Sequence, residues 1–258
     1  MQTAVELFAE ALYAAERDRR PIAPLTTQSG FDVECAYRTQ QALLARKLRD
    51  GARVVGYKIG LTAKAMRDQL GIAEPDYGFL LDSMLVDSGS TIVLADFIAP
   101  KIEPEIAFYL SKDLTGPSVT AADVIRNTDS LVAAFEIIDS RIADWKIALG
   151  DTIADNASSA RVVLASRRVP VDKVDLTNIA VDVRVDGDLV SRGRSADVLG
   201  NPAAAVAWLA TRLASYGVPL LAGQVIMPGA MTAAIALRVG SHYAASFEGI
   251  GDVTVGFR

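Results

Sequence analysis

The sequence Lys101-Ile-Glu-Pro-Glu-Ile-Ala-Phe108 alternates polar and apolar side chains, and this period predicts a β-strand. Successive side chains of a strand point to opposite faces of a sheet, so Glu103 and Glu105 are expected to lie together on one face. Two like charges side by side destabilise a sheet, and a cation between them would remove that cost. Because Pro104 lacks an amide hydrogen, we expect this strand to be an edge strand or an irregular one.

A second apolar segment, from Leu131 to Asp139, is also predicted to be a strand, and Glu136 lies within it. An acid among apolar side chains is costly to bury unless it is paired or coordinates a metal. Three carboxylates, with no histidine cluster and no cysteine pair in the sequence, favour Mg²⁺ or Mn²⁺ over Zn²⁺. The residues alone leave an alternative open, in which Glu103 and Glu105 face solvent and Glu136 pairs with a lysine or an arginine.

Two further charged residues lie in segments that contain glycine. Lys58, within Gly56-Tyr-Lys-Ile-Gly60, is predicted either to point inward and stabilise an anion or to be a surface lysine whose ammonium reaches water. Asp76 follows a proline within Glu74-Pro-Asp-Tyr-Gly78, a pattern typical of a turn, and this pattern alone indicates a structural role.

The hydrophobic period changes along the chain, from helical spacing in the first 50 residues to short strands in the remainder. The expected helices are Thr3–Asp18 with a capping box at Thr3 and Glu6, Val33–Asp50 closed by Gly51, Thr62–Leu70 closed by Gly71, Thr120–Asn127, and Ala203–Tyr216 capped by Asn201. The expected strands include 54–59, 101–110, 131–139, a 180–190 hairpin turning at Asp186-Gly187, and segments near 225, 234–239 and 253–257. These elements predict an α+β fold with a rolled, mixed sheet and helices outside it.

Composition excludes several classes of function. The chain has 258 residues and a net charge of −5, with no basic run among aromatics, which argues against nucleic-acid binding. No apolar run approaches the length of about 18 residues needed to span a membrane, and residues 3–20 do not resemble a signal peptide. The single cysteine, Cys35, fits a reducing compartment, so we expect a cytoplasmic protein. The sole histidine, His242, is assigned no role, and the sequence contains no glycine-rich phosphate loop.

Taken together, several segments resemble the 2-hydroxypenta-2,4-dienoate hydratases, also called 2-keto-4-pentenoate hydratases, of the fumarylacetoacetate hydrolase superfamily. The similarity covers nearly the whole chain, and its segments are Val54–Thr62, Glu74–Gly78, Glu103–Ala107, Glu136–Lys146, Asp151–Ser158 and Val198–Pro202. The chain departs from the family pattern at Glu74 and Tyr77, where many members have glutamine and phenylalanine, and at Gly240-Ser-His242, where the family often has Gly-Asp.

The resemblance implies roles for particular residues. Its metal-binding glutamates fall at Glu103, Glu105 and Glu136, with Mg²⁺ or Mn²⁺ as cofactor. Its active-site lysine falls at Lys58 and its acid at Asp76, and both are expected to be catalytic. Substrate binding is expected at Asn156, Ser158 and Arg141. The implied fold is a mixed, barrel-like β-roll, with a mainly helical portion at 1–75 and a catalytic core at 76–258.

The function implied by the resemblance is metal-dependent hydration of 2-hydroxypenta-2,4-dienoate, or of a close 2-hydroxydienoate, to 4-hydroxy-2-oxopentanoate in meta-cleavage catabolism of aromatic or steroid rings. The same metal site would serve a 4-oxalocrotonate decarboxylase, although the segment from Met227 to Ala234 is more similar to the hydratases. A non-catalytic subunit of a hydratase–decarboxylase complex is a further alternative, against which the intact glutamates and Lys58 argue. The resemblance also implies a homo-oligomer, and it allows a complex with a related decarboxylase or a downstream aldolase.

Overall fold

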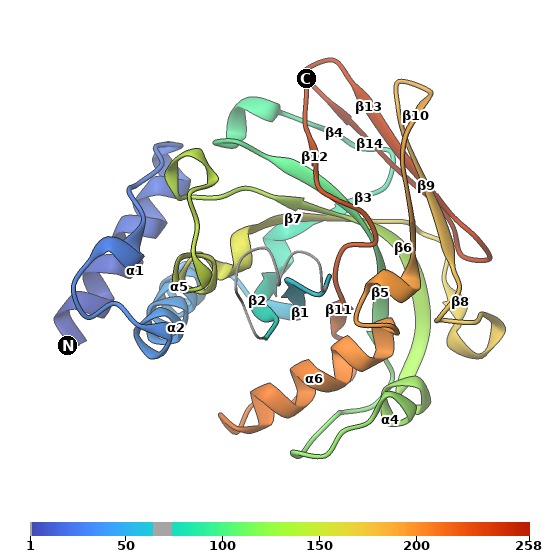
Figure 1. Ribbon diagram of the computed structural model, residues 1–258, viewed down its shortest axis with the longest axis horizontal. Helices are drawn as coiled ribbons and strands as arrows, with labels where there is room; N and C mark the ends of the chain where they lie inside the picture. The colour runs from blue at the N-terminus through green and yellow to red at the C-terminus, as the bar shows by residue number, and fades with distance from the viewer. Residues whose placement is uncertain (1, 64–73) are drawn as a thin grey trace.

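The computed structural model of the chain describes residues 2–63 and 74–258, and places three of its helices together at one end of the molecule (Figure 1). These are α1 (Gln2–Asp18), α2 (Val33–Arg49) and the short α5 (Leu149–Ala154). Two other helices, α4 (Ala121–Arg126) and α6 (Pro202–Ala214), pack against each other beside the strands. None of the described helices is long and apolar enough to cross a membrane.

Most predicted helix ends are confirmed by their caps. Asp32 accepts a hydrogen bond from the Cys35 amide at the start of α2, and α2 ends before Gly51, whose φ is +95°. The predicted start of the helix at Thr120 is also confirmed, because Thr120 and Asp123 form a capping box before α4. The predicted N-terminal helix is confirmed, but its capping box at Thr3 is wrong. Helix α1 begins at Gln2, so Thr3 lies inside its first turn. The helix predicted for 62–70, with its closing Gly71, falls largely outside the described residues.

The larger sheet positions the candidate site. Its strand order is β2-β1-β11-β5-β6-β7-β3, with β12 beside β5 and β8 beside β6. These strands are β1 (Val54–Gly60), β2 (Asp76–Leu81), β3 (Leu85–Asp87), β5 (Lys101–Leu110), β6 (Thr128–Ile138), β7 (Ser159–Leu164), β8 (Val169–Pro170), β11 (Val225–Met227) and β12 (Ile235–Ala236). Parallel and antiparallel pairs occur together, which confirms the predicted mixed sheet. Because β1 pairs with β2 and β11, main-chain hydrogen bonds join the predicted N-terminal portion to the core.

The smaller sheet has the strand order β10-β9-β13-β14-β4, and its strands β13 and β14 contact β6 of the larger sheet. Its strands are β4 (Thr91–Ile92), β9 (Ala180–Val185), β10 (Asp188–Arg194), β13 (His242–Phe247) and β14 (Gly251–Phe257). The predicted hairpin is confirmed, since Asp186 and Gly187 both have the positive φ that a type I′ turn requires. Strand β13 was not predicted, because alanine and serine weaken its apolar alternation.

Of the two alternatives predicted for the strand at Lys101–Leu110, the edge position is wrong and the irregular pairing is confirmed. Strand β5 is interior, with β6 on one side and β11 and β12 on the other. The carbonyl of Pro104 accepts a hydrogen bond from the Met231 amide at 3.0 Å, on the side away from β6. In a strand the nitrogen and the carbonyl of one residue face the same neighbour, so the proline nitrogen points between β11 and β12. An interior strand therefore tolerates Pro104 because its nitrogen interrupts no regular ladder.

Candidate active site

The pairing of β5 with β6 brings three carboxylates together. Glu103 and Glu136 are direct partners across the two strands, and Glu105 lies two residues further along β5 on the same face. Each of the three glutamates offers one carboxylate oxygen, and these atoms lie within 4.8 Å of one another. Glu105 and Glu136 are completely buried and Glu103 is half-buried, so the alternative in which Glu103 and Glu105 both face solvent is wrong for Glu105.

Hydrogen bonds satisfy only part of this carboxylate cluster. The Gly229 amide donates to Glu105 Oε2 at 2.8 Å, and Glu136 Oε2 has only the ion pair with Lys58, whereas Glu105 Oε1 and Glu136 Oε1 make no hydrogen bond within the described chain. Burial, and after it the charge of Glu136, raise the pKa of Glu103 to about 7 and that of Glu105 well above its ordinary value. A divalent cation would relieve both the repulsion and the unsatisfied oxygens. The all-oxygen donor set therefore fits Mg²⁺ or Mn²⁺.

Lys58 points inward from β1 toward the carboxylates. Its ammonium lies 3.2 Å from Glu136 Oε2, and it donates a hydrogen bond to the Ala157 carbonyl at 3.0 Å. The side chain is buried, which alone lowers the pKa of the amine, but the charges of Glu136 and Asp76 outweigh burial and hold the pKa above its ordinary value. Lys58 is thus a charged ammonium at neutral pH. Part of the alternative interpretation also holds, because Glu136 does pair with a lysine.

Asp76 lies in a strand, so the turn predicted from the preceding proline is wrong. It is the first residue of β2, is buried, and pairs with Gly60 of β1. The Thr152 hydroxyl of α5 donates to Asp76 Oδ2 at 2.9 Å. Burial raises the pKa of Asp76, and the charge of Lys58 and the bond from Thr152 offset part of that effect.

Gly60 allows the amine and the carboxylate to meet. A Cβ at this position would stand 2.2 Å from Asp76 Oδ1 and 3.4 Å from Lys58 Nζ. Both polar atoms therefore border the same small volume, which any larger residue would fill. The structure thus brings Lys58 and Asp76 together on the face of the sheet that carries the glutamates.

Asn156, Ala157 and Ser158 form a left-handed turn beside the site, with φ values of 54°, 49° and 55°. The Asn156 amide accepts from the Phe79 backbone amide at 2.7 Å and donates to the Phe79 carbonyl at 3.0 Å. The Ser158 hydroxyl bonds to Asp155 Oδ2 at 3.4 Å. The two residues predicted to bind substrate therefore direct their side chains to the protein, and the turn presents the Ala157 carbonyl to Lys58.

The strain of this turn leads to a stability prediction. An L-residue in the left-handed region costs about 1–2 kcal/mol, whereas glycine adopts it freely. Ala157→Gly is therefore expected to leave the free energy of unfolding unchanged or to raise it, as measured by urea denaturation. The control Ala154→Gly, at a buried helical position of α5, is expected to cost about 1 kcal/mol or more. Equal losses in the two variants would contradict the account of strain.

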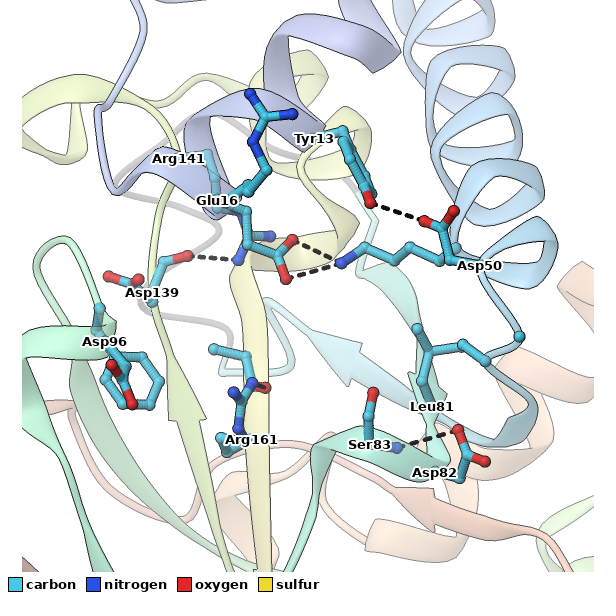
Figure 2. A pocket seen from close by; sticks show the side chains of 16 residues that line it. Tyr13, Glu16, Asp50, Leu81, Asp82, Ser83, Asp96, Asp139, Arg141 and Arg161 are labelled. Atoms are coloured by element: carbon cyan, nitrogen blue, oxygen red, sulfur yellow. Dashed lines mark hydrogen bonds and ion pairs between the residues drawn. The ribbon is translucent and has the colours of Figure 1, made fainter.

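A cavity of about 710 Å³ lies next to α1 and α2, on the side of the larger sheet that faces away from the three glutamates (Figure 2). Arg161 of β7 lines it and pairs with Ile137, the neighbour of Glu136. Because adjacent residues of a strand face opposite sides, the cavity and the glutamates are separated by the sheet. Charged groups of the cavity pair with each other, as Lys47 does with both oxygens of Glu16 at 2.7 Å.

Arg141 also lines this cavity and is bonded on several sides. Its guanidinium pairs with the Asp155 carboxylate and donates to the backbone carbonyls of Asp139, Asp155 and Ser159. The structure therefore holds Arg141 in a buried network of its own, which anchors Asp155 just ahead of the left-handed turn.

Sequence reasoning missed three residues that support the site: Gln40, Thr152 and Gly229. Gln40 lies on the buried face of α2 with Ala36 and Leu43, and a polar residue at that helical spacing is the available signal. Thr152 lies within the segment Asp151–Ser158 that carried the family resemblance. Gly229 lies within the segment from Met227 to Ala234 that is similar to the hydratases, but its amide reaches Glu105 only through the fold.

The chain is similar to known proteins over nearly its whole length. Residues 50–258 match the family model described as fumarylacetoacetate (FAA) hydrolase C-terminal. The chain is 46% identical over 251 residues to a 2-keto-4-pentenoate hydratase of Burkholderia vietnamiensis, covering 97% of this chain and 96% of the relative. It is 40% identical over 256 residues to a 2-hydroxyhexa-2,4-dienoate hydratase of Comamonas testosteroni, covering 98% and 97%.

Among solved structures, the fold is similar to that of 4-oxalocrotonate decarboxylase from Pseudomonas putida G7, complexed with magnesium and adipate. The TM-score is 0.96 and the sequence identity is 35%, with 100% of this chain and 98% of the other covered. The predicted α+β fold of this type is thereby confirmed.

Proposed function

Because the chain belongs to the fumarylacetoacetate hydrolase family, we propose that it is a hydratase of 2-hydroxypenta-2,4-dienoate or of a close 2-hydroxydienoate. The product is the corresponding 4-hydroxy-2-oxo acid. The observation that carries this proposal is the meeting of three carboxylates, two of them completely buried, with Lys58 and Asp76 on one face of the sheet. The names of the relatives that are 40–46% identical support hydration as the reaction.

In this proposal Glu103, Glu105 and Glu136 hold Mg²⁺ or Mn²⁺. Such an ion supplies Lewis acidity toward the carboxylate and 2-oxygen of a 2-oxo acid. The ammonium of Lys58 balances the remaining negative charge of the carboxylates and of the anionic substrate. Its ion pair with Glu136 and its bond to the Ala157 carbonyl fix the ammonium at one point of the site.

Two proton movements are needed, and we assign them to Lys58 and Asp76. In the first, the substrate loses the proton of its 2-hydroxyl group and gains one at C5, which gives an α,β-unsaturated 2-oxo acid. In the second, a water oxygen bonds to C4, its proton leaves, and C3 gains a proton. We propose that Asn156, Ser158 and Arg141 serve substrate binding by holding the turn and the segment beside it, since their described side-chain bonds are to the protein.

A specific observation favours a second candidate, decarboxylation of 4-oxalocrotonate. The structural relative with that name was solved with magnesium and with adipate, a six-carbon dicarboxylate. A decarboxylase needs a partner for the second carboxylate of its substrate. Arg141 is the cation predicted near the site, but its guanidinium binds Asp155 and backbone carbonyls. Because it is not placed to bind a second substrate carboxylate, the hydratase is favoured. The buried glutamates and Lys58 argue against a non-catalytic subunit.

The experiment is the ultraviolet loss of freshly generated 2-hydroxypenta-2,4-dienoate, with and without Mg²⁺ or Mn²⁺. We expect metal-dependent loss with formation of 4-hydroxy-2-oxopentanoate, absent in Glu103→Ala and retained in the control Glu248→Ala, whose side chain is exposed. The same preparations are given 4-oxalocrotonate, and release of CO₂ is measured. Turnover of 4-oxalocrotonate alone would assign the decarboxylase, and turnover of neither substrate would contradict both enzymatic proposals.

We further propose that the enzyme acts in the cytoplasm as a homo-oligomer and that its pathway is the meta-cleavage of aromatic or steroid rings. The free, half-buried Cys35 is consistent with a reducing compartment. A complex with a related decarboxylase or a downstream aldolase belongs to the same proposal, and native mass spectrometry of the purified protein measures the assembly directly.

A further inference from the structure

The two oxygens of the Asp76 carboxylate have different surroundings. Oδ2 accepts the hydroxyl hydrogen of Thr152 at 2.9 Å, and both side chains are buried. Oδ1 is buried as well, but it makes no hydrogen bond with any residue of 2–63 or 74–258. It lies against Gly60, beside the volume that Lys58 Nζ also borders. One oxygen is therefore held by a side-chain hydroxyl, whereas the other has no hydrogen-bonding side chain among the described residues and borders the same point at Gly60 as Lys58 Nζ.

A side-chain amide fixes the position of Thr152 relative to Asp76. Gln40 Nε2 donates to the carbonyl of Tyr77 at 2.8 Å and to the carbonyl of Ile153 at 2.9 Å. These carbonyls belong to the residues that directly follow Asp76 and Thr152 in the sequence. The buried amide of Gln40 therefore links β2 to α5 beside the hydrogen bond between the Thr152 hydroxyl and the Asp76 carboxylate.

The start of α5 is anchored on the other side of Thr152. The Asp151 carboxylate accepts hydrogen bonds from the Thr26 amide at 3.0 Å, the Thr26 hydroxyl at 2.6 Å and the Ala148 amide at 3.0 Å. Thr152 thus stands between two anchored neighbours, Asp151 and Ile153. Its hydroxyl cannot follow the carboxylate if Asp76 turns, so the bond selects one orientation of Asp76.

We propose that Thr152 is a positioning residue that makes Oδ1, and not Oδ2, the atom through which Asp76 takes its part in the proton movements of the hydration. The inference rests on the proposed function, and it deepens that function by naming the atom. With Oδ2 occupied by the hydroxyl, Oδ1 accepts the proton that leaves the 2-hydroxyl group or the attacking water. The same oxygen returns a proton to carbon, so the carboxyl group ends the reaction as it began.

The hydroxyl also stabilises the ionised carboxylate. Burial raises the pKa of Asp76, the charge of Lys58 lowers it, the bond from Thr152 lowers it next, and the backbone amides of Asp76 and Gly60 lower it after that. Removing the hydroxyl donor should therefore raise the pKa further, because the ionised form loses a hydrogen bond. Other ionisable groups that interact with Asp76 are Lys58 on β1, Glu103 on β5, Glu136 on β6 and Tyr37 on α2.

The first test needs no substrate. The pKa of Asp76 is measured by ¹³C NMR of labelled aspartate carboxyls in saturating Mg²⁺, with Asp76→Asn used to assign the signal. We expect Thr152→Val to raise this pKa by about one unit or more relative to the parent protein and to Thr152→Ser. The matched control is Thr39→Val, because Thr39 is also buried but bonds to the Cys35 carbonyl within α2. An unchanged pKa in folded Thr152→Val would overturn the proposal.

The second test uses the hydration itself. For Thr152→Val we expect kcat to fall about ten- to a hundredfold, KM to change less than about threefold, and the pH limb set by Asp76 to move upward. Thr152→Ser should restore most of the rate, which a purely structural role would not predict. If the valine variant does not fold, Thr152→Cys keeps the size but donates weakly and should shift both measurements in the same direction. If the pKa of Asp76 rises in Thr152→Val but the parent protein has no hydratase activity, the role of the Thr152 bond would be supported and the proposed function would be refuted.

Discussion

Replacing Glu105 by glutamine is expected to lower kcat/KM about a thousandfold and to abolish the stabilisation of the protein by Mg²⁺. The thousandfold loss corresponds to about 4 kcal/mol, the scale of transition-state stabilisation by a bound metal ion. Glutamine keeps an oxygen that can accept the Gly229 amide, so the fold around the side chain is retained. The melting temperature is measured by calorimetry with and without Mg²⁺, and kcat/KM is measured by the ultraviolet assay.

Without metal, Glu105→Gln is expected to stabilise the protein. Burial and the charge of Glu136 raise the pKa of Glu105, which means that the ionised carboxylate opposes folding above its ordinary pKa of 4.5. Removing that charge should therefore raise the metal-free melting temperature by a few degrees at neutral pH. The exposed Glu248→Gln is the control and should change neither quantity. Full Mg²⁺ stabilisation in Glu105→Gln would show that the ion binds elsewhere.

Replacing Lys58 by methionine is expected to have the largest effect on stability. It leaves the carboxylate of Glu136, completely buried, without its cation, and loss of one partner of a buried ion pair costs about 3–5 kcal/mol. We expect this loss in the metal-free protein by urea denaturation at pH 8, and part of it should be recovered on addition of Mg²⁺. Turnover should fall about a hundredfold or more, because the site also loses an ammonium group.

The pH dependence of Lys58→Met follows from Glu136. Burial raises the pKa of that carboxyl, and removing the charge of Lys58 raises it further, so the folded pKa lies above the ordinary value of 4.5. The destabilisation is therefore complete above the folded pKa of Glu136 and shrinks as the pH falls through that pKa. It is lost below 4.5, where Glu136 is protonated in both the folded and the unfolded state. Lys112→Met, at an exposed position, serves as the control. A loss that does not vary with pH would contradict an ion pair between Lys58 and Glu136.

The fold could be predicted where a local pattern decided the structure. The alternation at Lys101–Phe108, the Asp186-Gly187 turn and the caps Gly51 and Asn201 each determine a strand, a hairpin or a helix end from neighbouring residues. The edge assignment of the strand carrying Pro104 failed because the partners of a strand lie far away in the sequence. The hydrogen bond from Met231 to the Pro104 carbonyl shows that the proline nitrogen faces away from β6, and this contact cannot be read from the local sequence.

The site was predictable in part for the same reason. Two-residue spacing placed Glu103 and Glu105 on one face, but their distance to Glu136 depends on the register between β5 and β6. A local pattern suggested a turn at Asp76, whereas pairing with β1 makes it the start of a strand. The hydroxyl and amide groups of Thr152 and Gln40 gain their roles only when α5 packs on β2.

The register of β5 and β6 also limits how such a site can change over generations. A single-residue insertion between Glu103 and Glu105, or one that shifts β6 against β5, would turn a carboxylate to the wrong side of the sheet and dismantle the cluster at once. Lineages that descend from this protein are therefore free to lengthen or shorten their loops but not these two strands. New substrates would be acquired around a fixed pair of strands, through the segments that surround it.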